Sequence, residues 1–153
     1  SGKERAAGGR AGGRGAGNVR KQTVEGVRVL LGEDNILNQQ RAQEIMAYNG
    51  IVVSTAASGS QARRAIAESG PGFDLVLMDL QMPEMDGMAA TREIRTLPEF
   101  KALPIVAMTA HAMSGDRELS IKAGMNDHIN KPINLQELFS TLAKWLRKRP
   151  RLQ

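Results

Sequence analysis

Five polar residues of this 153-residue chain each stand near the end of a short strand-like run, and their types suit one reaction. They are three carboxylates, one hydroxyl and one ammonium: Glu33, Asp34, Asp79, Thr109 and Lys131. Clustered carboxylates repel one another unless a cation lies among them, and hard oxygen ligands suit Mg²⁺. A carboxylate beside that ion is a nucleophile for phosphorus, while the metal and the ammonium neutralise the transferring oxygens. Gathered by a fold, these residues indicate phosphoryl transfer to an aspartate, with the hydroxyl hydrogen-bonding the attached group.

Short apolar runs and amphipathic stretches alternate along the chain and predict the elements that position these residues. Strands are expected at 27–31, 51–55, 75–78, 105–108 and, more weakly, 127–130. Nearly continuous apolar runs are typical of strands buried on both faces of a parallel sheet. Helices are expected between and after them, at 36–49, 59–69, 87–96, 114–123 and 134–148.

The ends of these helices carry recognisable capping residues. Gly50, Gly70 and Gly124 stand where C-caps are expected. Asn134 followed by Glu137 predicts an N-cap with a capping-box partner. Five alternating strand–helix units predict a doubly wound α/β domain, in which ligands bind beyond the carboxyl ends of the strands. Chance rarely fills so many matching strand ends with complementary groups, so we interpret them as a site.

Charge and composition narrow the class of protein. The net charge is +5, but residues 1–25 carry +4, residues 144–153 carry +5, and residues 26–143 hold ten basic and fourteen acidic side chains. The expected folded part is therefore acidic, which argues against a nucleic-acid partner. The absence of Cys excludes disulfides and thiolate catalysis. No apolar run approaches the ~20 residues of a membrane span, so we expect a cytoplasmic domain without membrane contact.

Residues 1–25 are rich in Gly, Ala and Arg and predict a flexible linker, because they offer little to bury. They lack the interleaved aromatic residues on which RNA bases would stack, so an RNA-binding tail is the less favoured interpretation. We expect the folded domain at 26–148 and a basic tail at 149–153.

Four segments carry a resemblance to a known family: VLLGEDN (29–35), DLVLMDLQMPEMDG (74–87), PIVAMTAHAM (104–113) and AGMNDHINKPI (123–133). In this order and spacing they resemble response-regulator receiver domains of two-component systems, especially the receivers of hybrid sensor histidine kinases. The resemblance covers about residues 26–148. It implies a flavodoxin-like (βα)₅ fold with a doubly wound parallel sheet and strand order 2-1-3-4-5.

The resemblance also implies a role for each acidic residue. Asp79 would be the phosphoacceptor. Asp34 and Asp79 would bind Mg²⁺ (or Mn²⁺) directly, Glu33 would act through water, and the backbone carbonyl of Gln81 would be the third protein ligand. A backbone ligand explains why a neutral side chain is acceptable at position 81.

Further residues take family roles in phosphate contact, switching and docking. Thr109 would supply the hydroxyl and Lys131 the ammonium, with a cis peptide bond before Pro132. Thr109 and His128 occupy the switch positions, although His128 replaces the commoner Tyr or Phe. The phosphodonor would dock on the outward face of the helix at 36–49, through Asn38 and Arg41, and on Pro132 in the loop beside it. Arg41 stands where we expect an apolar residue, which makes that contact more electrostatic.

The residue at position 81 argues against two rival functions. A haloacid-dehalogenase-type hydrolase needs a second Asp two residues after its nucleophile, and a Toprim-type enzyme needs a D-x-D motif; Gln81 breaks both patterns. We therefore expect a monomeric receiver that accepts a phosphoryl group from a histidine kinase or a histidine phosphotransfer domain. The C-terminal receiver of a hybrid kinase, with a parent that can be membrane-bound, is the favoured setting. A stand-alone response regulator and an unphosphorylated protein-binding pseudo-receiver are the alternatives.

Overall fold

The computed structural model describes residues 24–69, 72–82, 84–110 and 114–147. Most of the expected linker, the basic tail and Gly70 lie outside the described residues. Val24 was expected in the linker but is buried, at 1% exposed, in the core beside Val27. The packed part of the chain therefore begins earlier than the expected start at Gly26.

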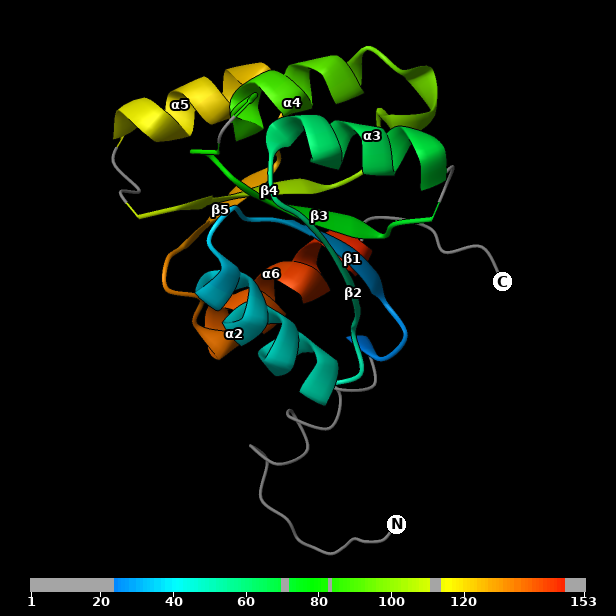
Figure 1. Ribbon diagram of the computed structural model, residues 1–153, viewed down its shortest axis with the longest axis vertical. Helices are drawn as coiled ribbons and strands as arrows, with labels where there is room; N and C mark the ends of the chain where they lie inside the picture. Colours follow the sequence, from blue (N-terminus) through cyan, green and yellow to red (C-terminus); the bar gives the residue numbers. More distant parts are fainter. Residues whose placement is uncertain (1–23, 70–71, 83, 111–113, 148–153) are drawn as a thin grey trace, which may run out of the picture.

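Five parallel strands form one sheet in the order β2-β1-β3-β4-β5, which confirms the predicted topology (Figure 1). The strands are β1 (Arg28–Gly32), β2 (Val52–Ala56), β3 (Leu75–Asp79), β4 (Ile105–Thr109) and β5 (Asp127–Asn130). All four strand pairings are parallel. The carboxyl ends of all five strands therefore lie at the same edge of the sheet.

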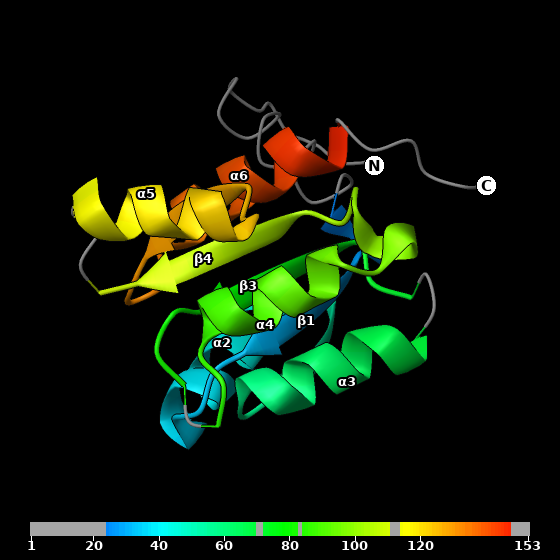
Figure 2. The same cartoon turned by 90° about the horizontal axis from the view of Figure 1, so that it is seen from above.

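Helices cover both faces of the sheet (Figures 1 and 2). They are α2 (Ile36–Tyr48), α3 (Gly59–Ser69), α4 (Gly87–Arg95), α5 (Ser114–Ala123) and α6 (Leu135–Arg147), with a short 3₁₀ turn η1 (Pro98–Phe100). Helices α2 and α6 lie on one face, and α3, α4 and α5 lie on the other. This arrangement is the doubly wound architecture that the sequence predicts.

The sheet separates two apolar clusters, because alternate residues of a strand point to opposite faces. On β1, Val29 and Leu31 join the cluster with α2 and α6, while Leu30 joins the cluster with α3 and α4. All residues of β3 and β4 are buried. Burying each large aliphatic side chain contributes roughly 1.5–3 kcal/mol, so these central strands contribute strongly to the stability of the core.

Helix ends follow the capping predictions with one exception. Gly50 and Gly124 adopt φ values of +87° and +112°, the left-handed conformation that helix-ending glycines supply. Asn134 Oδ1 accepts a hydrogen bond from the backbone N–H of Glu137 at 2.9 Å, as predicted for the N-cap. The predicted return bond, from the backbone N–H of Asn134 to the Glu137 side chain, is wrong. The Glu137 carboxylate instead accepts from Asn130 N at 3.4 Å. Since β5 is an edge strand, this N–H has no neighbouring strand to bond.

Candidate functional site

The residues predicted from strand ends line one cavity of about 600 Å³ at the carboxyl edge of the sheet. The cavity wall includes all five of them and Gln81: Glu33, Asp34, Asp79, Gln81, Thr109 and Lys131. They come from the ends of β1, β3, β4 and β5 or the residues that follow. The predicted convergence is confirmed, while the chemical role of each residue stays a prediction.

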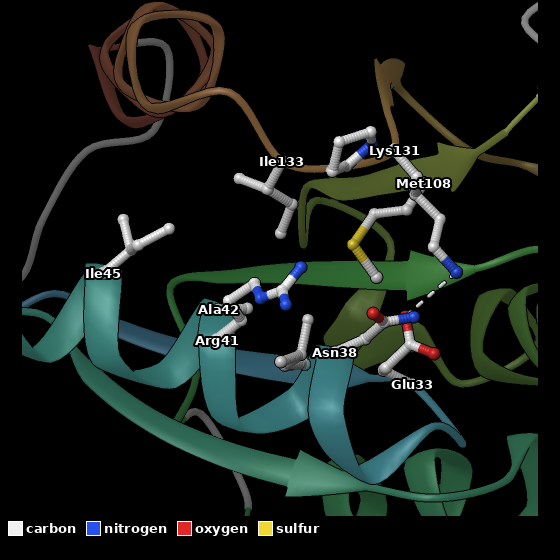
Figure 3. Close-up of a pocket in the computed structure, with 10 residues that line it drawn as sticks. Glu33, Asn38, Arg41, Ala42, Ile45, Met108, Lys131 and Ile133 are labelled. Atoms are coloured by element: carbon white, nitrogen blue, oxygen red, sulfur yellow. Dashed lines mark ion pairs between the residues drawn. The ribbon is translucent and has the colours of Figure 1, made fainter.

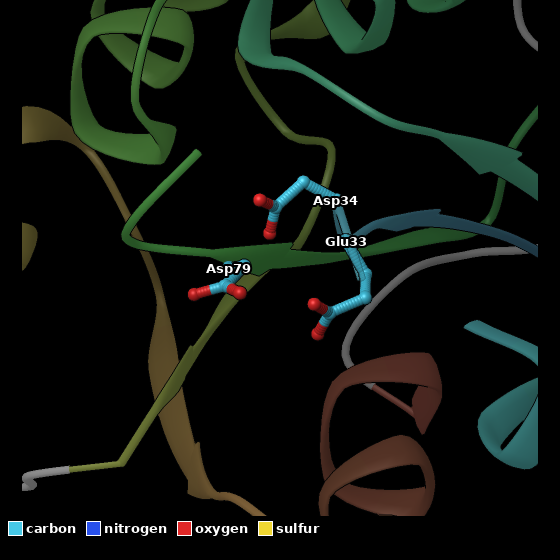
Figure 4. A group of neighbouring side chains, drawn as sticks. All are labelled: Glu33, Asp34 and Asp79. Carbon is cyan, nitrogen blue, oxygen red and sulfur yellow. The ribbon is translucent and has the colours of Figure 1, made fainter. Parts of the chain in front are cut away.

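Three carboxylates form the centre of this cavity (Figure 4). One oxygen from each of Glu33, Asp34 and Asp79 lies within 4.8 Å of the others. Glu33 and Asp79 are only 2% and 5% exposed, whereas Asp34 is exposed. Burial weakens solvent screening, so the mutual repulsion of these charges is stronger here than on an open surface.

Lys131 compensates part of this negative charge. Its Nζ lies 2.8 Å from Asp79 Oδ2 and 3.1 Å from Glu33 Oε1. Burial acts to lower the pKa of Lys131, but the hydrogen bonds and charges of Asp79 and Glu33 outweigh it and raise that pKa. Among the described residues, Asp34 forms no ion pair. Three carboxylates facing one ammonium leave a local excess of negative charge, and this oxygen-rich donor set fits a hard divalent cation.

Backbone amides fix the two buried carboxylates. Gln81 N donates to Asp79 Oδ1 at 3.1 Å, and Asn35 N donates to Glu33 Oε2 at 3.1 Å. The remaining oxygen of each carboxylate faces Lys131. Sequence reasoning missed both amide contacts because a backbone N–H has no residue-type signal. The side chain of Asn35 also caps α2 by accepting from Asn38 N at 3.0 Å.

Thr109 and the residues after β5 complete the wall. Thr109 is the last residue of β4 and is 5% exposed, while its neighbour Ala110 is exposed and leaves the cavity accessible. Lys131 N donates to Thr109 O at 3.0 Å. The Lys131–Pro132 peptide bond is cis, as expected.

A second hollow of about 290 Å³ adjoins the first and shares the side chains of Glu33, Asn38 and Lys131. One wall is α2 and the other is the segment after β5 (Figure 3). The predicted docking residues all line this groove: Asn38, Arg41 and Pro132. The guanidinium of Arg41 points from α2 across the groove. It forms no hydrogen bond or ion pair with the other described residues.

His128 lies on β5 outside both hollows and contacts α5. Its Nε2 is 2.5 Å from Ser120 Oγ. Ser120 Oγ also lies 3.0 Å from Arg117 O in the preceding turn of α5. The ring therefore joins the edge strand to α5, a partner that the sequence gave no means of finding.

The fold and the acidic edge define a doubly wound receiver-type domain, and comparison with known sequences identifies its family. Residues 29–143 match the family model described as response regulator receiver domain. The chain belongs to this family. The sequence is also similar to hybrid sensor kinases: it is 40% identical over 121 residues to sensor protein GacS of Pseudomonas syringae pv. syringae. It is 38% identical over 120 residues to hybrid signal transduction histidine kinase I of Dictyostelium discoideum.

These alignments cover 77% and 75% of the chain but only 13% and 7% of the relatives' lengths, so the chain matches a small part of each relative.

Solved receiver-domain structures share the fold of this chain. The receiver domain of sensor histidine kinase PA1611 from Pseudomonas aeruginosa PAO1 superposes with a TM-score of 0.74 at 40% identity, covering 80% of this chain and 98% of that one. That crystal structure holds a magnesium ion in its active-site cleft. The co-crystal structure of yeast Ypd1, a histidine phosphotransfer protein, with the receiver of Ssk1 gives a TM-score of 0.73 at 29% identity, covering 80% of this chain and 90% of that one. Separately, none of the helices in the described residues has the length and apolar character that spanning a bilayer requires.

Replacing Lys131 with Met removes the cation shared by Glu33 and Asp79. At neutral pH we expect the free energy of unfolding to fall by about 2 kcal/mol, less than for a fully buried pair because Lys131 is partly exposed. Unfolding by urea measures this loss. It shrinks at strongly alkaline pH, above the raised pKa of Lys131, because the uncharged amine no longer compensates the two carboxylates. The exposed Lys122→Met is the matched control, expected to change stability by less than about 0.5 kcal/mol. An equal loss at both pH values would contradict this account.

Proposed function

We propose that this domain takes a phosphoryl group from a phosphohistidine onto Asp79, in a Mg²⁺-dependent phosphorelay of a hybrid histidine kinase. One observation carries the proposal: three carboxylate groups converge at the strand ends with Lys131 as their cation. The hybrid setting is supported by the similarity to GacS and to the Dictyostelium kinase. A cytoplasmic monomer suits this role.

The donor set fits the magnesium ion found in the related PA1611 receiver. Asp34 and Asp79 would bind the ion directly, Glu33 would act through water, and Gln81 would contribute its backbone carbonyl. When bound, the ion neutralises charge on the phosphoryl oxygens. Asp34 suits this role because it lines the cavity and pairs with no basic side chain in the described part of the chain.

The chain's own residues would perform the remaining steps. A carboxylate oxygen of Asp79 forms the new bond to phosphorus, while the bond from phosphorus to the donor imidazole nitrogen breaks and its electron pair stays on that nitrogen. Gln81 N holds the other oxygen of Asp79 and orients the nucleophile. The ammonium of Lys131, already 2.8 Å from Asp79, can follow the charge onto the phosphoryl oxygens. The hydroxyl of Thr109 would hydrogen-bond the attached group.

Incubation with acetyl phosphate tests this reaction, because a small donor bypasses protein docking. We expect intact mass spectrometry to show one added phosphoryl group with Mg²⁺ and at least about a hundredfold slower addition without it. Asp79→Asn should abolish the addition, since an amide cannot form the acyl phosphate. Addition that survives this substitution would place the acceptor elsewhere, and no addition to the wild type would favour the pseudo-receiver alternative.

The groove beside the phosphoacceptor is the proposed docking site for the phosphodonor. It opens between α2 and the segment after β5, and two exposed apolar residues of α2, Ile36 and Leu37, lie at the same end of the helix. The related Ssk1 receiver was crystallised with a histidine phosphotransfer protein, which supports a partner of this kind. No acidic group among the described residues pairs with Arg41 in the groove, so we expect an acidic residue on the donor surface opposite it.

Reversing the charge at Arg41 tests this docking site. With a phosphotransfer protein that phosphorylates the wild-type domain, Arg41→Glu should lower kcat/KM about tenfold, or about 1.4 kcal/mol. The rate with acetyl phosphate should stay unchanged, because Arg41 does not touch Asp79. Arg64→Glu on α3, across the sheet from α2, is the control with the same change in charge. Equal losses in both variants would point to general electrostatics rather than to docking.

His128 and Thr109 are the proposed switch residues. Thr109 would move toward the phosphoryl group, and His128 would transmit the change to α5 through Ser120. This mechanism uses a hydrogen bond between strand and helix in place of an aromatic rotamer.

Hydrogen exchange of α5 tests the switch. In the wild type, phosphorylation should change amide exchange across α5. His128→Phe fills a similar volume but cannot form a hydrogen bond with Ser120, and should therefore reduce that change by at least about twofold. Ser120→Ala should do the same, since it removes the other side of the bond. An unaltered response in both variants would exclude His128 as the connection.

A further inference from the structure

The loop between β3 and α4 carries Gln81 and leans on a helix that contributes nothing to the cavity wall. This helix is α3, whose first two residues are Gly59 and Ser60. We infer that Gly59 and Ser60 are positioning residues for the metal site: they hold the loop that places Gln81 beside Asp79. This inference rests on the proposed magnesium-dependent function.

Gly59 is required for space rather than for conformation. Its φ lies outside the left-handed region, and alanine is favoured over glycine within helices. A Cβ at this position would collide with the carbonyl oxygen of Met85 and lie 2.6 Å from its carbonyl carbon and 3.0 Å from Asp86 O. Backbone atoms cannot step aside as a flexible side chain can, so any larger residue at position 59 displaces the loop.

Ser60 adds a directed bond to the same part of the loop. Its hydroxyl donates to Glu84 O at 3.1 Å. Glu84 and Met85 have φ values of +64° and +154°, which non-glycine residues seldom adopt. Such backbone conformations persist when surrounding contacts hold them. Ser60 therefore braces the strained centre of the loop.

The two ends of the loop are tied to the site and to α4. Gln81 N donates to Asp79 Oδ1 at 3.1 Å, and Gly87 N donates to Leu80 O at 3.2 Å. Asp86 caps α4 by accepting from Ala89 N at 2.8 Å. The loop is thus tied at both ends and braced from α3 at Glu84 and Met85, so displacing these two residues would disturb the position of Gln81.

The helix that supplies the brace is itself firmly placed. Ser58, 3% exposed, accepts from Gln61 N at 3.1 Å, and Gln61 Oε1 accepts from Ala57 N at 2.9 Å. Arg63 Nε pairs with Glu93 Oε1 of α4 at 3.0 Å. These bonds order the first turn of α3, and the burial of Ala62 and Ile66 in the core holds the helix in place.

Calorimetric titration with MgCl₂ tests the inference on the whole domain. Removing a group that orients a metal ligand typically weakens metal affinity 10–100-fold. Ser60 and Gly59 contact the loop and not the ligand itself, so their effect should be smaller, near or below the lower end of this range. We therefore expect Ser60→Ala to weaken Mg²⁺ binding roughly fivefold and Gly59→Ala by at least about tenfold. Ser60→Thr retains the hydroxyl and should bind within about twofold of the wild type. With acetyl phosphate, saturating Mg²⁺ should restore the rate of Ser60→Ala, because the chemistry at Asp79 is intact.

Ser69→Ala is the matched control, since it removes the same atoms from the other end of α3. Unchanged Mg²⁺ affinity in Ser60→Ala would overturn the inference and leave the proposed function standing, provided that the wild type binds the ion. Equal weakening in Ser69→Ala would also overturn it, because general loosening of the helix would then be the cause. A wild type that binds no Mg²⁺ would defeat the proposed function and this inference together. If Gly59→Ala fails to fold, Ser60→Ala and Ser60→Thr decide the question.

Discussion

Repulsion between carboxylates at the carboxyl edge of the sheet is the constraint on which the rest of the structure depends. Glu33 and Asp79 are nearly fully buried, where water screens their charges poorly. Two different kinds of group make this burial tolerable: the ammonium of Lys131, and the backbone amides of Asn35 and Gln81. All of them must be held within ångströms, so the site needs a rigid frame more than it needs additional residues.

The central strands provide that frame. All residues of β3 and β4 are buried, and both Asp79 and Thr109 are the last residues of these strands. Parallel pairing of β1 with β3 and of β3 with β4 brings residues distant in sequence to the same edge. The acidic site is thus an extension of the apolar core, and its geometry is as firm as the packing beneath it.

Sequence patterns predicted the features that depend on residue type and on the spacing of apolar residues, namely the strands, the helices and the strand-end site residues. The strands and helices fall within about one or two residues of their expected bounds, because apolar runs and caps are local signals. Contacts made by backbone atoms or between distant elements were beyond such patterns. Gly59 gave no hint that Met85 O lies against it, and Glu137 turned to an edge-strand amide instead of closing its capping box. Similarly, no spacing rule pairs His128 with Ser120.

Glu33, Asn38 and Lys131 each form part of both the acidic cavity and the neighbouring groove. A molecule seated in the groove would therefore feel the charge state of Asp79 through a shared wall. If Asp79 accepts a phosphoryl group as proposed and Lys131 turns toward it, Glu33 would lose its cation, and the surface offered to the donor would become more negative. By thermodynamic reciprocity, the same coupling makes release of the spent donor depend on completed transfer. The common wall would thus couple donor binding to the state of Asp79 without any separate gate.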